Sequence, residues 1–437
     1  MRAGSLLPVL LVVLSIPSSA CLTEVFLNPI ALNVTHYATF QSHNQKVVSN
    51  ENGIFLTYTY QFDLQTAWTR WRLVRSTDGG KTFSVVYTSP EMGSNAPCID
   101  TDSDNNILLV CTDYNDPRDR PFYYYRFEAA RNYTDPRITT AKYHASGKFS
   151  MYYHGESDLI YLFNHYGRLI VLNATSGKHV LQKDVMKTSG DNAMTQYPHV
   201  FVSPDGVLHH AWTTQKHSEY MYWDIHYARS GDGGRNWQTA NGTGLPREFK
   251  PDDSGPSDQI IMGDEFDYHT WLTSMVVKGG KAHFAYLCQT PDRRMEYVRL
   301  DLETGLIDIR VQPFFGGETV DIYGLDGFFC TGPGTSPLYY VARANLTHIG
   351  ALVSHDNGET WHDAAISEPL PNSIYSVGGC RELVPEGIIG SFTNQYGVYP
   401  DTIAGDVYFF RIPVPEAVHL MAFLLLPPVL RRVILKS

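Results

Sequence analysis

Ser230-Gly231-Asp232-Gly233-Gly234-Arg235-Asn236-Trp237 is one of three stretches in the chain that read S-x-D-x-G-x-x-F/W. Each follows a strand-like run of alternating apolar residues. The Asp can accept hydrogen bonds from nearby backbone N–H groups, the Gly can take a positive φ, and the aromatic begins a return strand. Three such turns in the same setting predict a repeated hairpin in a β architecture. The shared positions are Ser76, Asp78, Gly80, Phe83, Ser230, Asp232, Gly234, Trp237, Ser354, Asp356, Gly358 and Trp361.

The repeated turn resembles the Asp-box of BNR-repeat β-propellers, a class that includes the sialidases. In those families the box is a structural turn at the blade periphery, so the resemblance implies architecture and not chemistry. Apolar runs with period two, separated by Gly, Asn, Asp and Pro, form seven clusters spaced by about 50 residues, which is typical of propeller blades. We expect an all-β, seven-bladed β-propeller, with six blades as the alternative. The clusters lie near residues 36–90, 95–130, 137–182, 195–240, 268–312, 318–365 and 373–413.

The 437 residues are long enough for one large closed domain, expected over residues 21–415. Residues 1–20 have the charged start, apolar core and small-residue end of a secretory signal peptide, with acylation of Cys21 in a bacterial lipoprotein as the alternative. Residues 416–437 form an apolar tail of unclear role, too short for a comfortable membrane span of about 20 residues. We therefore expect a secreted, extracellular protein without a transmembrane helix. The stretch Gly242–Phe266, rich in Pro, Asp and Gly, is expected to be an extended loop.

Sequons and cysteines support secretion. The chain has six cysteines, an even number, and all of them follow residue 20. Cys98 and Cys111 flank an expected hairpin, which predicts a disulfide within one blade. The pairing of the other cysteines stays open. The five N-x-S/T sequons are expected to be glycosylated: Asn33, Asn132, Asn173, Asn241 and Asn345.

The net charge of −11 argues against a nucleic-acid partner, although a local basic cleft could still bind a polyanion. His209 and His210 are adjacent and point to opposite faces of a strand, and no H-x-H or H-E-x-x-H pattern occurs. No metal and no cofactor is therefore expected.

The fourth cluster holds the densest set of aromatic and imidazole groups. Strand alternation puts Tyr197 and His199 on one face, while His209 lies on the next strand, followed by Trp212. Innermost propeller strands line a central channel where ligands commonly bind. The competing interpretation is that these side chains only satisfy their buried neighbours.

The same region resembles the BNR-repeat family that includes the ulvan lyases, which are seven-bladed propellers that cleave uronic-acid polysaccharides by β-elimination. The resemblance rests on Thr195–Val200, the Pro204-Asp205-Gly206 turn, Asp224–Ser230 and Asp158–Leu169. His144 lies 21 residues before His165, a spacing similar to that family's paired histidines. The resemblance implies that His165 is the base and Tyr197 the acid, with His144 assisting.

This chain departs from the family at one important position. The lyases' carboxylate-neutralising Arg is expected on the strand after the Pro-Asp-Gly turn, where this chain has Ala211-Trp212-Thr213-Thr214. Arg168 or Lys216 would have to replace it. Otherwise the site binds sugar without turnover, with Trp212 and Tyr197 as stacking platforms. The expected substrate-binding residues are His199, His209, Trp212 and Arg168.

Three functions follow, with an extracellular polysaccharide or glycan as the expected partner. The first is a polysaccharide lyase acting on uronate glycans. The second is a non-catalytic glycan- or protein-binding propeller. The third is a sialidase-type exo-glycosidase, because Phe410-Arg411-Ile412-Pro413 spells the sialidase F/Y-R-I-P element, although at the C-terminal end of the domain. The simpler interpretation of this element is a final strand that ends at a proline.

Overall fold

The structure is a computed structural model in which the first described residue is 23 and the last is 414. The described residues are 23–35, 38–40, 44–63, 68–90, 96–112, 121–141, 148–187, 194–215, 222–250, 258–261, 270–288, 294–312, 314–315, 318–319, 327–396 and 404–414. The proposed signal peptide and the apolar tail at 416–437 lie outside this range. No helix among these residues is long and apolar enough to cross a membrane.

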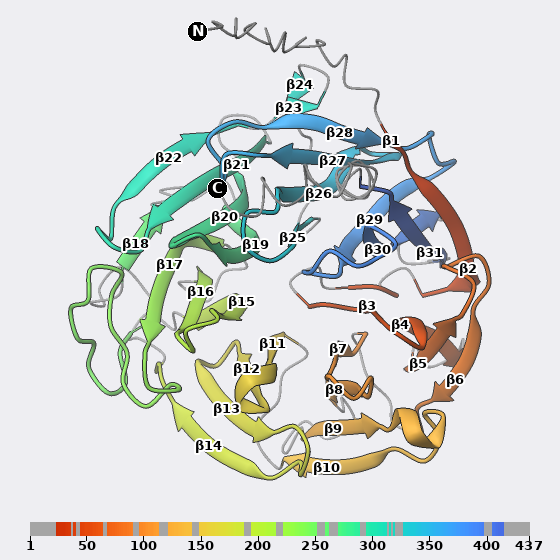
Figure 1. Ribbon diagram of the computed structural model, residues 1–437, viewed down its shortest axis with the longest axis horizontal. Helices are drawn as coiled ribbons and strands as arrows, with labels where there is room; N and C mark the ends of the chain where they lie inside the picture. The colour runs from red at the N-terminus through yellow and green to blue at the C-terminus, as the bar shows by residue number, and fades with distance from the viewer. Residues whose placement is uncertain are drawn as a thin grey trace, which may run out of the picture.

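Seven antiparallel sheets form a ring, so the protein is an all-β, seven-bladed propeller (Figure 1). Blade 1 contains β3 (Val47–Asn50), β4 (Gly53–Asp63), β5 (Trp68–Ser76) and β6 (Ser84–Thr88). Blade 2 contains β7 (Cys98–Thr101), β8 (Ile107–Thr112), β9 (Phe122–Phe127) and β10 (Arg137–Ala141). Blade 3 contains β11 (Phe149–His154), β12 (Leu159–Asn164), β13 (Arg168–Asn173) and β14 (His179–Asp184). Blade 4 contains β15 (Met194–Val202), β16 (Leu208–Gln215), β17 (Tyr222–Ser230) and β18 (Asp258–Ile261).

The remaining blades follow the same order from the innermost strand outward. Blade 5 contains β19 (Thr270–Lys278), β20 (Lys281–Cys288), β21 (Arg294–Asp301) and β22 (Ile307–Val311). Blade 6 contains β25 (Phe328–Thr331), β26 (Leu338–Asn345), β27 (His348–Ser354) and β28 (His362–Ile366). Blade 7 contains β29 (Ser373–Gly379), β30 (Ile388–Tyr396) and β31 (Ala404–Ile412). Outside the blades lie a small hairpin, β23 (Phe314–Phe315) with β24 (Glu318–Thr319), and two 3-10 turns, η1 (Ala129–Arg131) and η2 (Gly155–Ser157).

The N-terminal segment closes the ring. β2 (Phe26–Val34) pairs antiparallel with β31 as the outermost strand of blade 7, and β1 (Thr23–Glu24) pairs parallel with β28 of blade 6. The first and last parts of the domain are therefore joined by a ladder of backbone hydrogen bonds. This arrangement covers strand edges that would otherwise be open to pairing with other chains.

The core lies between neighbouring blades. Leu108 and Val110 of blade 2, for example, pack with Ile160 and Leu162 of blade 3. The innermost strands of the seven blades surround the centre of the ring in Figure 1. Because both faces of each sheet are covered, the middle strands are buried on both sides, as β8 is throughout its length.

Two expectations about the blades need correction. Residues 137–141, which the sequence analysis assigns to the third cluster, form β10 and complete blade 2. The expected loop Gly242–Phe266 contains a strand, β18, which pairs with β17 through Ile225 and Ile261. This strand has only four residues, Asp258–Ile261, and lacks the apolar–polar alternation that reveals strands in sequence.

The three Asp-boxes share one hydrogen-bond pattern. The Ser hydroxyl donates to the Asp carboxylate at 2.7 Å in the first box and at 2.8 Å in the second and third. The box glycine's N–H donates back to that Ser oxygen at 2.8, 2.9 and 2.7 Å. The Asp then accepts the N–H of the residue four positions on, at 2.9 Å in every box. The box is thus closed by its own side chains.

The box glycines also hold neighbouring blades together. Gly80, Gly234 and Gly358 have φ of 91°, 93° and 90°, values that L side chains rarely adopt. A Cβ there would come within 2.1 Å of Phe409, 2.1 Å of Leu169 and 1.8 Å of Tyr297 respectively. Each of these contacts lies on the third strand of the preceding blade.

Asp356→Asn protein is expected to be about 1–2 kcal/mol less stable than wild type near pH 7, because the amide keeps one of the two acceptor oxygens. Burial works to raise the pKa of the Asp356 carboxyl, but hydrogen bonds from Thr360 and Ser354 together lower it to about 2. A lowered pKa means that the stabilisation is present above the unfolded pKa of about 4 and is lost as the pH falls toward the folded value. Urea unfolding at several pH values should show the deficit shrinking below about pH 4. Asp135→Asn, at an exposed surface carboxylate, is the control, and an equal deficit in both variants would contradict the assignment.

The expected disulfide between Cys98 and Cys111 does not form. Cys98 pairs with Val110 across β7 and β8, so Cys111 points to the opposite face of the sheet. Cys98 joins the core between blades 2 and 3, while Cys111 joins the core between blades 1 and 2. Both are buried free thiols in this structure. The hairpin itself is confirmed, but its register separates the two sulfurs.

The sequon asparagines have different surroundings. Asn33, Asn132, Asn241 and Asn345 are exposed, whereas Asn173 is half-buried and its amide donates to Asp158 at 2.9 Å. Glycosylation at these positions stays a prediction.

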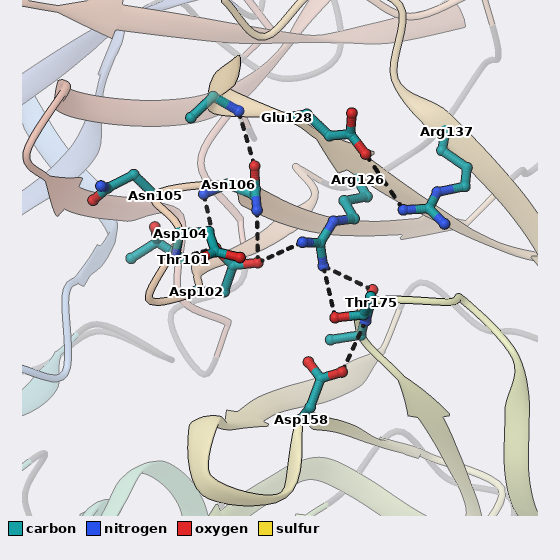
Figure 2. A network of polar contacts seen from close by, with 12 residues as sticks. Thr101, Asp102, Asp104, Asn105, Asn106, Arg126, Glu128, Arg137, Asp158 and Thr175 are labelled. Atoms are coloured by element: carbon teal, nitrogen blue, oxygen red, sulfur yellow. Dashed lines mark hydrogen bonds and ion pairs between the residues drawn. The ribbon is translucent and has the colours of Figure 1, made fainter. Parts of the chain in front are cut away.

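A buried ion pair in blade 2 also contacts blade 3 (Figure 2). Arg126 of β9 lies 3.0 Å from the Asp102 carboxylate, and their side chains are only 7% and 6% exposed. Asn106 donates to the same carboxylate at 2.9 Å. The guanidinium also donates to the Ala174 carbonyl, 3.2 Å away in the turn after β13. One arginine therefore connects the β7–β8 turn to the next blade.

Candidate functional site

A polar and aromatic cluster lies at one end of blades 3, 4 and 5. Lys148 immediately precedes β11, Tyr197 lies near the start of β15, and Tyr222 and Trp271 begin β17 and β19. β17 runs parallel to β15, because each is antiparallel to β16 between them. These residues consequently belong to the same end of their strands.

Lys148 is the cation of this cluster. Its ammonium donates to the Gln196 side-chain oxygen at 2.8 Å and lies 5.1 Å from the centre of the Tyr197 ring. The Tyr222 ring centre is 5.8 Å away. Gln196 in turn donates to Gln215 at 2.7 Å. An ammonium held over aromatic faces is favoured by their electron-rich π systems.

Tyr197 is held in an unusual conformation. The register of β15 against β16 shifts between Gln196 and His199, which marks a bulge, and Tyr197 has φ 48°. Its hydroxyl donates to the Tyr222 hydroxyl at 3.3 Å, and both rings pack against Trp271. Bulges and positive φ at a bulky residue cluster at functional sites, where they aim a side chain. Tyr197 is 4% exposed, so the packing around it fixes the direction of its hydroxyl.

His165 lies beside this cluster, directly after β12. Its backbone N–H donates to the Lys148 carbonyl at 3.1 Å, and its own carbonyl accepts a hydrogen bond from the Thr195 hydroxyl. The imidazole is half-buried and contacts the exposed Tyr166 ring, with centroids 3.9 Å apart. The structure therefore brings His165 and Tyr197 to adjacent strand ends, linked through Lys148 and Thr195. His144 and Lys216 lie outside the described residues.

His199 is buried two positions beyond Tyr197, at 5% exposure. Burial lowers the pKa of its imidazole to about 3, so the ring is neutral at physiological pH. A neutral imidazole can donate and accept hydrogen bonds but cannot neutralise a carboxylate.

The structure places two of the expected substrate-binding residues in the core. His209 is 2% exposed and lies between the Tyr227 hydroxyl (2.6 Å) and Ser203 (3.0 Å). Trp212 is fully buried between the stacked rings of His210 and His226, so it offers no platform to a sugar. These two positions lie on the middle strand β16, where both faces of the sheet are covered, and for them the sugar-binding prediction is wrong.

Arg168 does not supply the missing cation. Its guanidinium forms a two-contact ion pair with Asp184 on β14, at 2.6 and 3.2 Å. β13 and β14 are the outer strands of blade 3, away from the central channel. Lys148 is not expected from the sequence, because the resemblance to the lyases places the cation on the strand after the Pro-Asp-Gly turn. The available signal was a Lys directly before an innermost strand, four residues after His144.

A second polar group crosses the central channel. Arg381, just after β29, donates to the Met151 carbonyl at 2.8 Å and to Asp100 at 2.9 Å, and it stacks on Tyr152 at 4.6 Å. Burial raises the pKa of Asp100 to about 6, although the nearby Arg381 charge works to lower it. Because these contacts join blades 7, 2 and 3, we interpret Arg381 as a brace across the ring.

Arg411, the arginine of the F/Y-R-I-P element, points away from the channel. It donates to the Gly79 carbonyl in the first Asp-box at 3.2 Å and stacks on Phe26 at 5.3 Å. The element is the end of β31, followed by a proline, and it gives no support to a sialidase arginine triad. Among the described residues, no group of three or more His, Cys, Asp or Glu side chains is placed to hold a metal ion.

Comparison with known proteins confirms the Asp-box resemblance. Residues 164–265, which include Tyr197 and the second box, match a family described as BNR repeat-containing family member. No curated protein matches the sequence.

Several solved structures share the fold. A PL25 ulvan lyase bound to GlcA(1-4)Rha3S units has a TM-score of 0.60 at 10% identity, covering 87% of this chain and 94% of the lyase. The polysaccharide lyase Uly1 has a TM-score of 0.56 at 10% identity, covering 90% and 99%. The α-L-arabinofuranosidase Arb93A of Fusarium graminearum reaches 0.50 at 10% identity, covering 89% and 98%. The chain therefore has a propeller fold that polysaccharide lyases and a glycoside hydrolase also have.

Proposed function

We propose that the protein is a secreted enzyme that cleaves uronic-acid polysaccharides by β-elimination. The observation that carries the proposal is the position of Lys148. Its ammonium lies 5.1 Å from the centre of the Tyr197 ring, and its backbone carbonyl accepts a hydrogen bond from the His165 N–H. A cation, a tyrosine hydroxyl and an imidazole are the three groups that this chemistry requires. Secretion rests on the signal-like residues 1–20 and on the sequons.

Each of the three residues has a role in the reaction. Lys148 pairs with the uronate carboxylate, so that negative charge developing at the α carbon is stabilised. The His165 imidazole removes the α proton. The bond from the β carbon to the glycosidic oxygen breaks, Tyr197 gives its proton to that oxygen, and the α and β carbons become doubly bonded. The products are an unsaturated uronate and a new sugar hydroxyl, and no water is consumed.

Lys148 also explains how the site could act without the lyases' carboxylate-neutralising arginine, which is absent from Ala211-Trp212-Thr213-Thr214. A carboxylate needs one positive partner within about 4–6 Å, and the element that carries the partner is unimportant if the charge reaches the same place. A lysine at the start of β11 reaches the Tyr197 ring from blade 3, whereas an arginine on β16 would reach it from within blade 4. Lys148 thus replaces the expected arginine from a different strand.

Lys148→Met protein is expected to lose about 100-fold in kcat/KM on an acidic uronate polymer. The loss should be much smaller on the same polymer after methyl esterification, because an ester has no charge to neutralise. Initial rates of unsaturated product on the two polymers measure both effects. Lys178→Met, at an exposed lysine between β13 and β14 of blade 3, is the control. Equal losses on the acid and the ester would contradict the role of Lys148.

The function itself is tested by incubating the purified protein with uronate polysaccharides and sialosides. The proposal predicts ultraviolet absorbance from an unsaturated uronate with at least one of the uronate polymers. Free sialic acid would assign a sialidase instead. Binding of the polymers without product would assign a glycan-binding propeller, and either of these results overturns the proposal.

A further inference from the structure

A cavity of about 430 Å³ lies at the outer rim between blades 3 and 4. Its walls come from β14, from the second Asp-box and from the segment that follows the box. It is distinct from the candidate active site: Tyr222 and Ser230 stand at opposite ends of β17, about 26 Å apart at about 3.3 Å per residue. The lining residues are Leu181, Lys183, Arg235, Asn236, Trp237, Leu245, Pro246 and Arg247.

Three of the lining residues are cations, and none has a neutralising partner in the described part of the chain. Among the described residues, no carboxylate lies within ion-pair distance of Lys183, Arg235 or Arg247. The nearby acids are occupied or turned elsewhere: Asp184 pairs with Arg168, and Asp232 closes the box. Glu248, next to Arg247, is exposed and makes no such pair.

The cavity is held in shape by its own contacts. The Lys183 ammonium donates to the Arg235 carbonyl, and Arg235 donates to the Asp232 carbonyl at 2.9 Å. Past the box, Leu245 donates to the Trp237 carbonyl at 2.8 Å, and Phe249 donates to the Val185 carbonyl at 3.2 Å. Both walls are therefore fixed by hydrogen bonds, and a ligand would not have to order them.

A fixed positive site is unusual on a protein with a net charge of −11. At physiological salt the Debye length is about 8 Å, so distant negative charges do not cancel the local field of three grouped cations. The cavity can therefore attract an anionic polymer although the net charge of the molecule is negative.

The lining favours a sugar acid over a nucleic acid. Single-stranded nucleic acids need exposed aromatic rings on which their bases stack. Trp237 is only 4% exposed, and its indole N–H is bonded to the Gly234 carbonyl at 3.1 Å. Leu181, Leu245 and Pro246 instead supply an apolar floor for sugar rings beside guanidinium groups that bind sulfate or carboxylate. The volume is in the usual range of about 300–1,000 Å³ for small-ligand sites.

We propose that this cationic groove, defined by Lys183, Arg235, Arg247 and the apolar floor, is a second binding site for anionic polysaccharide. It rests on the proposed function, because a remote site would keep a long uronate polymer attached while the active site cuts it. Such tethering raises the effective concentration of polymer at the active site. A short oligosaccharide, which cannot reach both sites, gains nothing from the groove.

The test compares Arg235→Gln/Arg247→Gln protein with a matched control, Lys81→Gln/Arg131→Gln. Lys81 occupies the position of Arg235 in the first Asp-box, and both pairs remove two exposed positive charges. Binding to ulvan, dextran sulfate, neutral dextran and single-stranded DNA is measured by calorimetry at about 0.15 M NaCl. All proteins carry Tyr197→Phe, which is intended to prevent turnover during the measurement.

The groove variant should bind ulvan and dextran sulfate about tenfold more weakly than the control, because two charge-assisted contacts are lost. Neutral dextran should bind to neither protein. Equal affinities of the groove variant and the control would overturn the proposal, as would tighter binding of single-stranded DNA than of dextran sulfate. Because binding is measured without turnover, the two proposals can fail separately. Weaker binding by the groove variant, together with no unsaturated product from the protein that keeps Tyr197, would refute the lyase function and support the groove.

Discussion

Tyr197→Phe protein is expected to lose about 10³-fold in kcat on a uronate polysaccharide, while keeping its fold and most of its affinity for the polymer. The substitution removes the hydroxyl that would protonate the leaving oxygen. The ring that packs against Trp271 and lies under the Lys148 ammonium stays in place. Initial rates of ultraviolet absorbance give kcat, and thermal unfolding checks the fold.

Tyr166→Phe is the matched control for this substitution. Tyr166 contacts His165 but is 49% exposed and lies outside the aromatic cluster. Its loss of a hydroxyl should change kcat by about twofold or less. If both phenylalanine variants retained wild-type rates, Tyr197 would be a packing residue, and the acid would have to be sought elsewhere.

Arg126→Met protein is expected to be about 3–5 kcal/mol less stable than wild type, because the substitution leaves the buried Asp102 carboxylate without its ion-pair partner. The methionine replaces the apolar stem of the arginine, so little of the packing along that stem is lost. The hydrogen bonds to the turn after β13 disappear as well, which loosens blade 3 from blade 2 (Figure 2). Urea unfolding measures the change.

Two further variants separate the ion pair from other effects. Arg137 lies directly opposite Arg126 on β10 and pairs with Glu128 in an exposed position, so Arg137→Met should cost about 0.5 kcal/mol or less. Asp102→Asn/Arg126→Met protein should be more stable than Arg126→Met alone, because it buries no unpaired charge. A double variant less stable than the single one would show that the hydrogen bonds of the Asp102 turn dominate.

The fold is readable from sequence because the Asp-box is a local structure. Its Ser, Asp and Gly bond to one another within eight residues, and the same strand precedes each copy, so no distant contact is needed to recognise it. The outermost strands are harder to read, since β18 and β10 have only four and five residues. The closure by β2 depends on pairing with β31, more than 370 residues away, which no local pattern reveals.

The candidate site is only partly readable for the same reason. His165 and Tyr197 are recognisable because their motif resembles a known family, and the structure places them at adjacent strand ends. Lys148 comes from another blade, and its position over Tyr197 follows from the ring geometry. His209 and Trp212 look like ligand-binding residues in sequence, but aromatic and imidazole side chains on a middle strand fill the core. The predicted Cys98–Cys111 disulfide is wrong because of the strand register: Cys98 lies opposite Val110, and a shift of one residue puts a side chain on the other face of the sheet.

The most direct test compares two products of one reaction: unsaturated uronate, read by its ultraviolet absorbance, and new reducing ends, counted chemically. Each elimination makes one unsaturated uronate and one new reducing end. The two products should therefore rise together in a one-to-one ratio on a uronate polysaccharide. The rise should be lost with Tyr197→Phe and kept with Tyr166→Phe. New reducing ends without ultraviolet absorbance would mean that the propeller hydrolyses its substrate, and the assignment of Lys148, His165 and Tyr197 as an elimination site would be wrong.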